Sequence, residues 1–276
     1  RVGDAGASEL AAALGRGALP RLKRLRLSHA AIGDAELVAL APVLRRLPAL
    51  KELELQGNLF GEQGLAALLA PPPAGALPPT AGALTKLLVL SLDRTQVTDA
   101  GCAALAVALD SGALPALQRL DLDSTGIGDA GLVALAPALR RLSALEVLYL
   151  EGNPLGDEGI AALVAPPPPA GALPLPIGGL KKLKLLDLMQ TQVTDAGCTA
   201  LAAALDSGML PALGALKLDG IPASATAKEA VDAALARCAA RALLAVCVSR
   251  LRGQFVALYN TMRNAYGRLS AGRVYV

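Results

Sequence analysis

Leucine recurs through most of this chain in one fixed frame, L-x-x-L-x-x-L-x-L. The frame starts seven times, at Leu19, Leu47, Leu84, Leu114, Leu142, Leu180 and Leu210. Successive starts are 28, 37, 30, 28, 38 and 30 residues apart, so a triplet of units occurs twice. A repeat of this period predicts a solenoid, in which copies of one supersecondary unit stack and bury a shared core.

Each unit has the pattern of a short strand, a turn and a helix. The last two leucines of the frame are two residues apart and therefore share one face of a strand. A G-D-A-G or T-D-A-G turn usually follows, and we expect its aspartate to be the N-cap of the helix that comes directly after it in the same repeat. These aspartates are Asp34, Asp99, Asp129, Asp157 and Asp195. The helix carries an L-x-x-L-A-x-x-L stripe that a single strand and helix cannot bury, whereas stacked copies can.

Residues 145–165, LEVLYLEGNPLGDEGIAALVA, carry the complete pattern L-x-x-L-x-L-x-x-N-x-L-G-D-x-G-x-x-x-L. In this the chain resembles the leucine-rich repeats of the ribonuclease-inhibitor type, over about residues 2–222. The resemblance implies an α/β solenoid, a horseshoe with parallel inner strands and outer helices. The family's ladder asparagine is kept only at Asn58 and Asn153. Threonine replaces it at Thr95, Thr125 and Thr191, and Ala30 and Ile221 lack a polar group, so we expect the first and last turns to be less well fixed.

The sequence predicts that the chain has two structurally different parts. Residues 1–223 form a solenoid of about seven repeats, with proline-rich loops at 70–83 and 165–179 that are rigid connectors or ligands for an aromatic groove. Residues 224–276 form a helical segment, because the frame fails at Ala223 and the net charge changes from −3 over residues 1–225 to +6 over 226–276.

The helical segment carries an apolar, aromatic face. Phe255, Tyr259, Met262 and Tyr266 recur at helical spacing. A solenoid end exposes its core and needs a cap, so this face either packs on the last repeats or docks on a partner. The sequence leaves both readings open.

Catalytic chemistry has little support in these residues. The chain has one histidine, and it contains no phosphate-binding glycine loop and no zinc-protease motif. Its four cysteines have no metal-ligand spacing and are expected to be buried, reduced thiols, which favours an intracellular, cytoplasmic protein with an organelle as the alternative. We expect no cofactor, no metal and no catalytic residue. No segment has the length and apolarity of a transmembrane helix.

The inner face of the strands is the best candidate for a binding surface. Residues between the strand leucines point away from the core, and their identities are free to serve binding. We expect a partner to contact Glu54, Asp93, Asp121, Asp123, Tyr149, Glu151, Asp187 and Met189. This acidic and apolar mixture would suit a basic segment of a protein and would repel nucleic acid.

The sequence therefore predicts a non-catalytic, protein-binding scaffold, a subunit of a larger assembly that binds its partner on the concave face. The resemblance leaves an alternative open, a GTPase-activating protein of the Ran type, because that family shares this repeat class.

Overall fold

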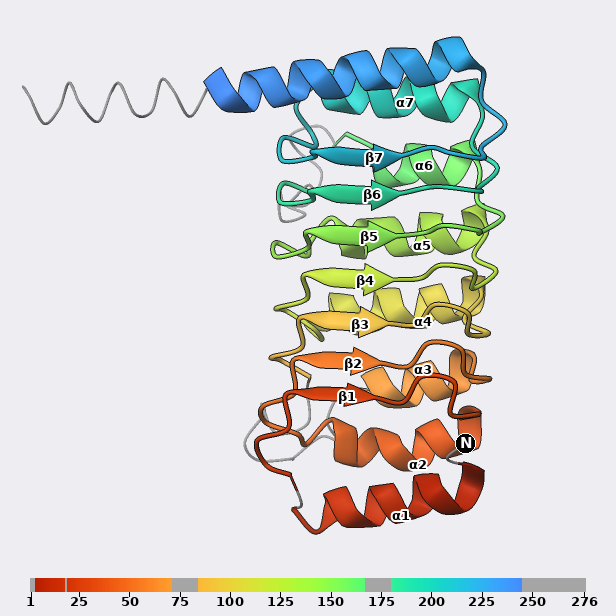
Figure 1. Cartoon of the computed structure of the whole chain (residues 1–276), viewed down its shortest axis with the longest axis vertical. Coiled ribbons are helices and arrows are strands. Elements are labelled where there is room, and N and C mark those ends of the chain that lie inside the picture. The colour runs from red at the N-terminus through yellow and green to blue at the C-terminus, as the bar shows by residue number, and fades with distance from the viewer. Residues whose placement is uncertain (1–2, 18, 71–83, 167–179, 245–276) are drawn as a thin grey trace, which may run out of the picture.

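The computed structural model describes residues 3–17, 19–70, 84–166 and 180–244. Strands and helices alternate along the chain and stack into a solenoid, as predicted (Figure 1). The helices are α1 (Gly3–Gly15), α2 (Asp34–Leu44), α3 (Glu62–Leu69), α4 (Asp99–Asp110), α5 (Asp129–Leu139), α6 (Asp157–Leu163) and α7 (Asp195–Asp206). The strands are β1 (Arg24–Arg26), β2 (Glu52–Glu54), β3 (Val89–Ser91), β4 (Arg119–Asp121), β5 (Val147–Tyr149), β6 (Leu185–Asp187) and β7 (Ala215–Lys217). Another helix covers residues 225–244.

The strands form one parallel sheet in the order β1-β2-β3-β4-β5-β6-β7. Equivalent positions of the repeats pair throughout, so that Leu90 lies beside Leu120 and Leu120 beside Leu148. The same register brings Ser91 beside Asp121 and Asp121 beside Tyr149. Each position between the leucines therefore becomes a straight column of side chains across the outer surface of the sheet.

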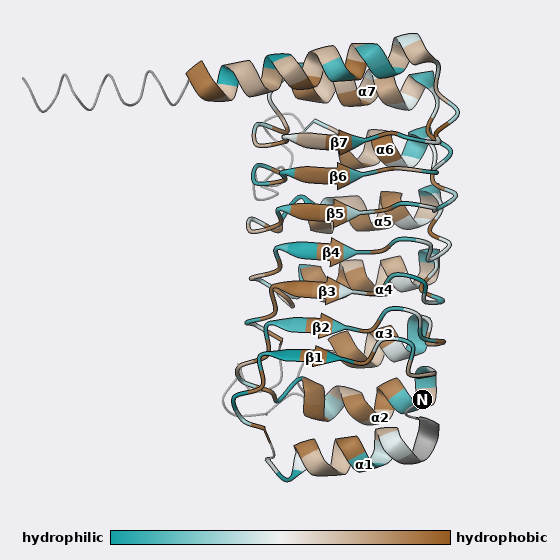
Figure 2. Cartoon of the chain, viewed as in Figure 1, coloured by the Kyte–Doolittle hydropathy of each residue, from teal (hydrophilic) through white to brown (hydrophobic). Residues whose placement is uncertain are grey.

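The core lies between the sheet and the layer of helices behind it (Figure 1). Strand leucines such as Leu53 and Leu120 and helix leucines such as Leu105 and Leu135 are fully buried. Parallel strands pack about 4.8 Å apart whereas helices need about 8–10 Å, so a stack of this kind curves toward its strands. We therefore name the outer surface of the sheet the concave face. Taken residue by residue, the strands β1, β2 and β4 are mainly hydrophilic and β3, β5 and β6 mainly apolar (Figure 2).

Asn58 and Asn153 tie neighbouring repeats together in the turns after the strands. Each side chain is buried. The Asn153 Oδ1 accepts hydrogen bonds from the backbone N–H groups of Thr125 and Ile127, and its Nδ2 donates to the carbonyl of Leu122. The replacing threonines bond differently, because each hydroxyl donates to the carbonyl three residues earlier in its own turn, as Thr191 does to Leu188. An asparagine joins two repeats, whereas these threonine–carbonyl bonds stay within one.

The aspartates that begin the helices do not cap their own helices, which corrects our expectation. The residue before each aspartate, a glycine or threonine, holds the N-cap position. The aspartate instead accepts hydrogen bonds from the start of the next helix. Asp129 Oδ1, for example, accepts from the backbone N–H of Gly156 at 2.7 Å and of Gly159 at 2.8 Å. The other four aspartates do the same, since each accepts a backbone hydrogen bond at the start of the helix in the following repeat. They are Asp34, Asp99, Asp157 and Asp195. The stack places each carboxylate closer to the free N–H groups at the start of the next repeat's helix than to those of the helix that the aspartate itself begins.

The helix over residues 225–244 continues this arrangement beyond α7. Ser224 donates its backbone N–H and its hydroxyl to Asp195, as Thr194 does to Asp157. Val231, Ala234 and Cys238 are buried in the core. This helix thus covers the end of the stack. The predicted aromatic face of Phe255, Tyr259, Met262 and Tyr266 lies outside the described residues, as do nearly all of the two proline-rich stretches.

Candidate functional site

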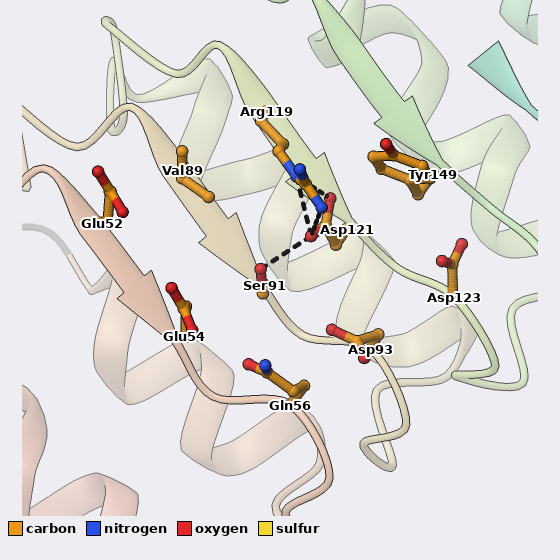
Figure 3. Close-up of a pocket in the computed structure, with 10 residues that line it drawn as sticks. All are labelled: Glu52, Glu54, Gln56, Val89, Ser91, Asp93, Arg119, Asp121, Asp123 and Tyr149. Atoms are coloured by element: carbon orange, nitrogen blue, oxygen red, sulfur yellow. Dashed lines mark hydrogen bonds and ion pairs between the residues drawn. The ribbon is translucent and has the colours of Figure 1, made fainter. Parts of the chain in front are cut away.

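The concave face has one open hollow, among the residues that the structure describes, that gathers polar side chains from four consecutive strands. Its volume is about 510 Å³ (Figure 3). The side chains that line it are Glu52, Glu54, Gln56, Val89, Ser91, Asp93, Arg119, Asp121, Asp123 and Tyr149. They come from β2 to β5 and from the turns that follow β2, β3 and β4.

Arg119 organises the middle of the hollow. Its guanidinium pairs with Asp121 at 2.9 Å, and the hydroxyl of Ser91 donates to the same carboxylate at 2.8 Å. The Asp121 side chain is only 8% exposed, so these two partners supply the solvation that it loses in the fold. The guanidinium also lies 4.7 Å from the centre of the Tyr149 ring. This contact holds the ring in place by a cation–π interaction.

Two carboxylates in the hollow have no cation of their own. Neither Asp93 nor Asp123 forms an ion pair with any described residue, and both are half-buried. Burial raises the pKa of Asp123 to about 7, helped by the nearby charges of Asp187, Glu151 and Asp121. Burial also raises the pKa of Asp93, with a further contribution from Asp121. Both ionised carboxylates would be stabilised by a cation from outside.

The β2 side of the hollow is already neutralised. Arg24 pairs with Glu52, and Arg26 pairs with Glu54 at 2.9 Å. The side-chain oxygen of Gln56 is buried and accepts no hydrogen bond from a described residue. This oxygen therefore adds an unused acceptor beside the two unpaired carboxylates.

The predicted residues at β5 and β6 form a second, separate group. Asp187 is fully buried, and it accepts from Lys217 at 2.8 Å and from the backbone N–H of Met189. Lys217 also lies 5.7 Å from the Tyr149 ring, on which Arg119 packs as well. Asp187, Met189 and Glu151 do not line the hollow, whereas the other predicted residues do: Glu54, Asp93, Asp121, Asp123 and Tyr149.

The structure adds lining residues that the sequence prediction left out. Glu52 and Arg119 occupy the strand position two residues before Glu54 and Asp121. Their outward direction follows from the period of two along a strand. Register alone could have identified them, but the pairing of Arg119 with Asp121 and Tyr149 depends on side-chain conformation.

The described residues give no sign of a metal centre or a membrane span. Among them, no three or more His, Cys, Asp or Glu side chains are grouped so as to hold a metal ion. None of the helices in the described ranges is long and apolar enough to cross a membrane.

Comparison with protein families identifies the repeat. The leucine rich repeat family matches residues 83–106, 114–136, 143–164 and 179–202. Each match covers a strand and all or most of the helix after it. These four segments are leucine-rich repeats, and they lie within one solenoid of stacked repeats.

Many solved structures resemble this chain, whereas no curated protein matches it. One is the actin-binding site 2 of leiomodin-1, with 16% identity, a TM-score of 0.37 and coverage of 90% of this chain and 96% of that one. Another is pollen receptor kinase 3, with 22% identity, a TM-score of 0.36 and coverage of 66% and 67%. Leucine-rich repeats of this kind generally mediate binding between proteins.

Proposed function

We propose that this leucine-rich-repeat protein is a non-catalytic scaffold that binds a protein partner on its concave face, with a basic segment of the partner in the hollow. The observation that carries the proposal is the pair of half-buried carboxylates, Asp93 and Asp123, neither of which forms an ion pair with a described residue and both of which have a raised pKa. A lysine or arginine from a partner would supply the positive charge. Its arrival would also offset the repulsion from Asp121, which helps to raise the pKa of both groups.

The walls of the hollow suit a peptide chain. Val89 and Tyr149 are half-buried and offer apolar contact area beside the carboxylates. The Tyr149 ring is held by two cations, so little conformational entropy is lost when a partner packs on it. A rigid aromatic side chain beside a charged pocket is typical of a protein-binding hot spot. A nucleic-acid backbone would meet the same carboxylates as a repelling surface.

Two finer features belong to the same proposal. We infer that the repeats are of the ribonuclease-inhibitor type, because α2 to α7 are true α-helices of 7 to 12 residues. We also infer that the protein works as a subunit of a larger assembly, in which the concave face holds one partner.

Charge reversal on the concave face tests the proposal. The partner is first isolated from the native source by affinity purification with the intact protein. Replacing Asp93, Asp123 and Glu151 with lysine is then expected to abolish capture of that partner and to invert the salt dependence of any residual binding.

A matched control has the same change in net charge on the helical side. Glu158, Glu229 and Asp232 are exposed, and their replacement with lysine should leave capture unchanged. Equal capture by both triple variants would place the partner elsewhere and overturn the proposal. Equal loss in both would do the same, because only total charge would then matter.

A further inference from the structure

The charges of this protein are sorted between the two long edges of the solenoid. One edge consists of the connectors from each helix to the next strand, which we name the helix-to-strand edge. In its described residues, 16–17, 19–23, 45–51, 84–88, 111–118, 140–146, 164–166, 180–184 and 207–214, every charged residue except Glu146 is a cation. The opposite connectors, from strand to helix, carry Asp93, Asp123, Glu151 and Asp219 against Arg94 alone.

Some cations on the helix-to-strand edge have structural roles. Arg45 and Arg140 donate to the carbonyls of Ala70 and Ala162, at the ends of the following helices. Arg141 pairs with Asp110 at 2.9 Å, and Lys184 pairs with Glu146 at 2.7 Å. These contacts lie within the fold and leave other cations of the edge unused.

The remaining cations are all exposed, and none forms an ion pair with a described residue. They are Arg16, Arg21, Lys23, Arg46, Lys51, Lys86, Lys181 and Lys182. Favourable interaction with helix dipoles accounts for cations that follow a helix end closely, such as Arg46 after α2. It does not account for Lys23, Lys51 or Lys182, which lie just before strands.

The spacing of the repeats makes these charges act together. Adjacent strands are about 4.8 Å apart, and the screening length at physiological salt is about 8 Å. Cations of neighbouring repeats therefore reinforce one another's potential where consecutive connectors carry them, at residues 16–23, 45–51 and 86 and again at 181–184. The connectors 111–118 and 207–214 carry no charge. A straight, positive edge of this kind matches an extended anionic surface better than a single small ligand.

Exposed leucines accompany the cations at both ends of the same edge. Leu19, in the first connector, is 55% exposed. At the other end, Leu243 and Leu244 are 70% and 65% exposed. They follow Arg241, which donates to the carbonyls of Leu205 and Asp206 where α7 ends on this edge. Apolar side chains among cations are a feature of proteins that lie on lipid headgroups and insert a few residues into the acyl boundary.

We propose that the helix-to-strand edge docks on an anionic lipid surface, with its exposed lysines and arginines on the headgroups and Leu19, Leu243 and Leu244 entering the interface. This proposal is independent of the concave-face function, because the edge and the hollow occupy different sides of each repeat. The leucines favour lipid over nucleic acid, for which phosphate contacts and base contacts would be the main source of affinity.

Sedimentation of the full chain with vesicles tests the proposal. We expect binding to vesicles that contain phosphatidylserine and no binding to pure phosphatidylcholine, with affinity falling as salt rises. The double reversal Lys86→Glu and Lys182→Glu should weaken binding by about tenfold or more. The milder double variant Lys181→Gln and Lys182→Gln should also weaken vesicle binding, by a smaller factor. Leu19→Ser should weaken vesicle binding without changing its salt dependence.

The control is Arg94→Glu with Lys228→Glu, which changes the net charge by the same amount away from this edge. We expect this control variant to bind phosphatidylserine vesicles as well as wild type does. Loss of vesicle binding equal to that of the edge variant would overturn the proposal. So would equal binding to charged and neutral vesicles, or binding to DNA without binding to phosphatidylserine.

Discussion

The backbone N–H of Glu151 donates a 2.7 Å hydrogen bond to Oδ1 of Asp123, which joins the turn after β5 to the turn after β4. This bond favours the ionised carboxylate, yet the pKa of Asp123 is raised to about 7. Burial and the charges of Asp187, Glu151 and Asp121 outweigh the single hydrogen bond. The hollow thus contains an acid that titrates near neutral pH.

Protonation of Asp123 should stabilise the fold. Since its folded pKa exceeds the unfolded value of about 3.9, the native state binds more protons between about pH 4 and pH 7, and stability falls as pH rises through that window. Asp123→Asn keeps the acceptor oxygen and removes the charge. We expect this variant to resist urea better than wild type at about pH 8, with the difference shrinking toward about pH 5. A stability difference between Asp123→Asn and wild type that stays the same from about pH 8 to about pH 5 would contradict the raised pKa of Asp123.

Arg119 is expected to matter more than its exposed position suggests. Arg119→Ala leaves the buried carboxylate of Asp121 with Ser91 alone and should cost about 1–3 kcal/mol. Adding Asp121→Asn should recover part of that loss. The comparison is Arg24→Ala, which breaks the more exposed pair with Glu52 and should lower stability less than Arg119→Ala does in the same denaturation experiment. Equal costs would show that the hollow does not bury Asp121.

Asn153 should be one of the costliest polar residues to remove. Asn153→Ala leaves buried backbone groups in two repeats without partners and should lose about 2–4 kcal/mol in thermal or urea unfolding. Thr191→Val removes one hydrogen bond within a single turn and should lose about 1 kcal/mol. A reversed order of the two variants would contradict the inter-repeat role of the asparagine.

Gly57 is required by both its conformation and its neighbour. Its φ is +68°, and a Cβ there would lie 2.2 Å from Nδ1 of His29. Gly57→Ala should therefore lower stability by more than the roughly 1–2 kcal/mol of left-handed strain. His29→Ala should remove the steric clash with the new Cβ but not the backbone strain at position 57. The double variant Gly57→Ala with His29→Ala should therefore be more stable than Gly57→Ala alone. Simple additivity of the two changes would rule out the contact.

The columns of the concave face were predictable from the sequence, whereas their pairings were not. The leucine frame fixes which strand residues point outward, and equal repeats pair at equal positions, so Asp93 and Asp123 were correctly expected to be near each other. Asp121 and Asp187 were expected to be available to a partner in the same way. Each is instead buried beneath a cation, because Arg119 and Lys217 have side chains long enough to fold over them.

The sequence by itself determined the α/β solenoid, the parallel order of its strands and the asparagine positions, since all three depend on spacings that repeat along the chain. Only the tertiary structure decided which groups each side chain meets across the stack. Asp129 could have capped its own helix, but the next repeat places the N–H groups of Gly156 and Gly159 at 2.7 and 2.8 Å. A local pattern describes one repeat, and the contacts that hold this protein together run between repeats.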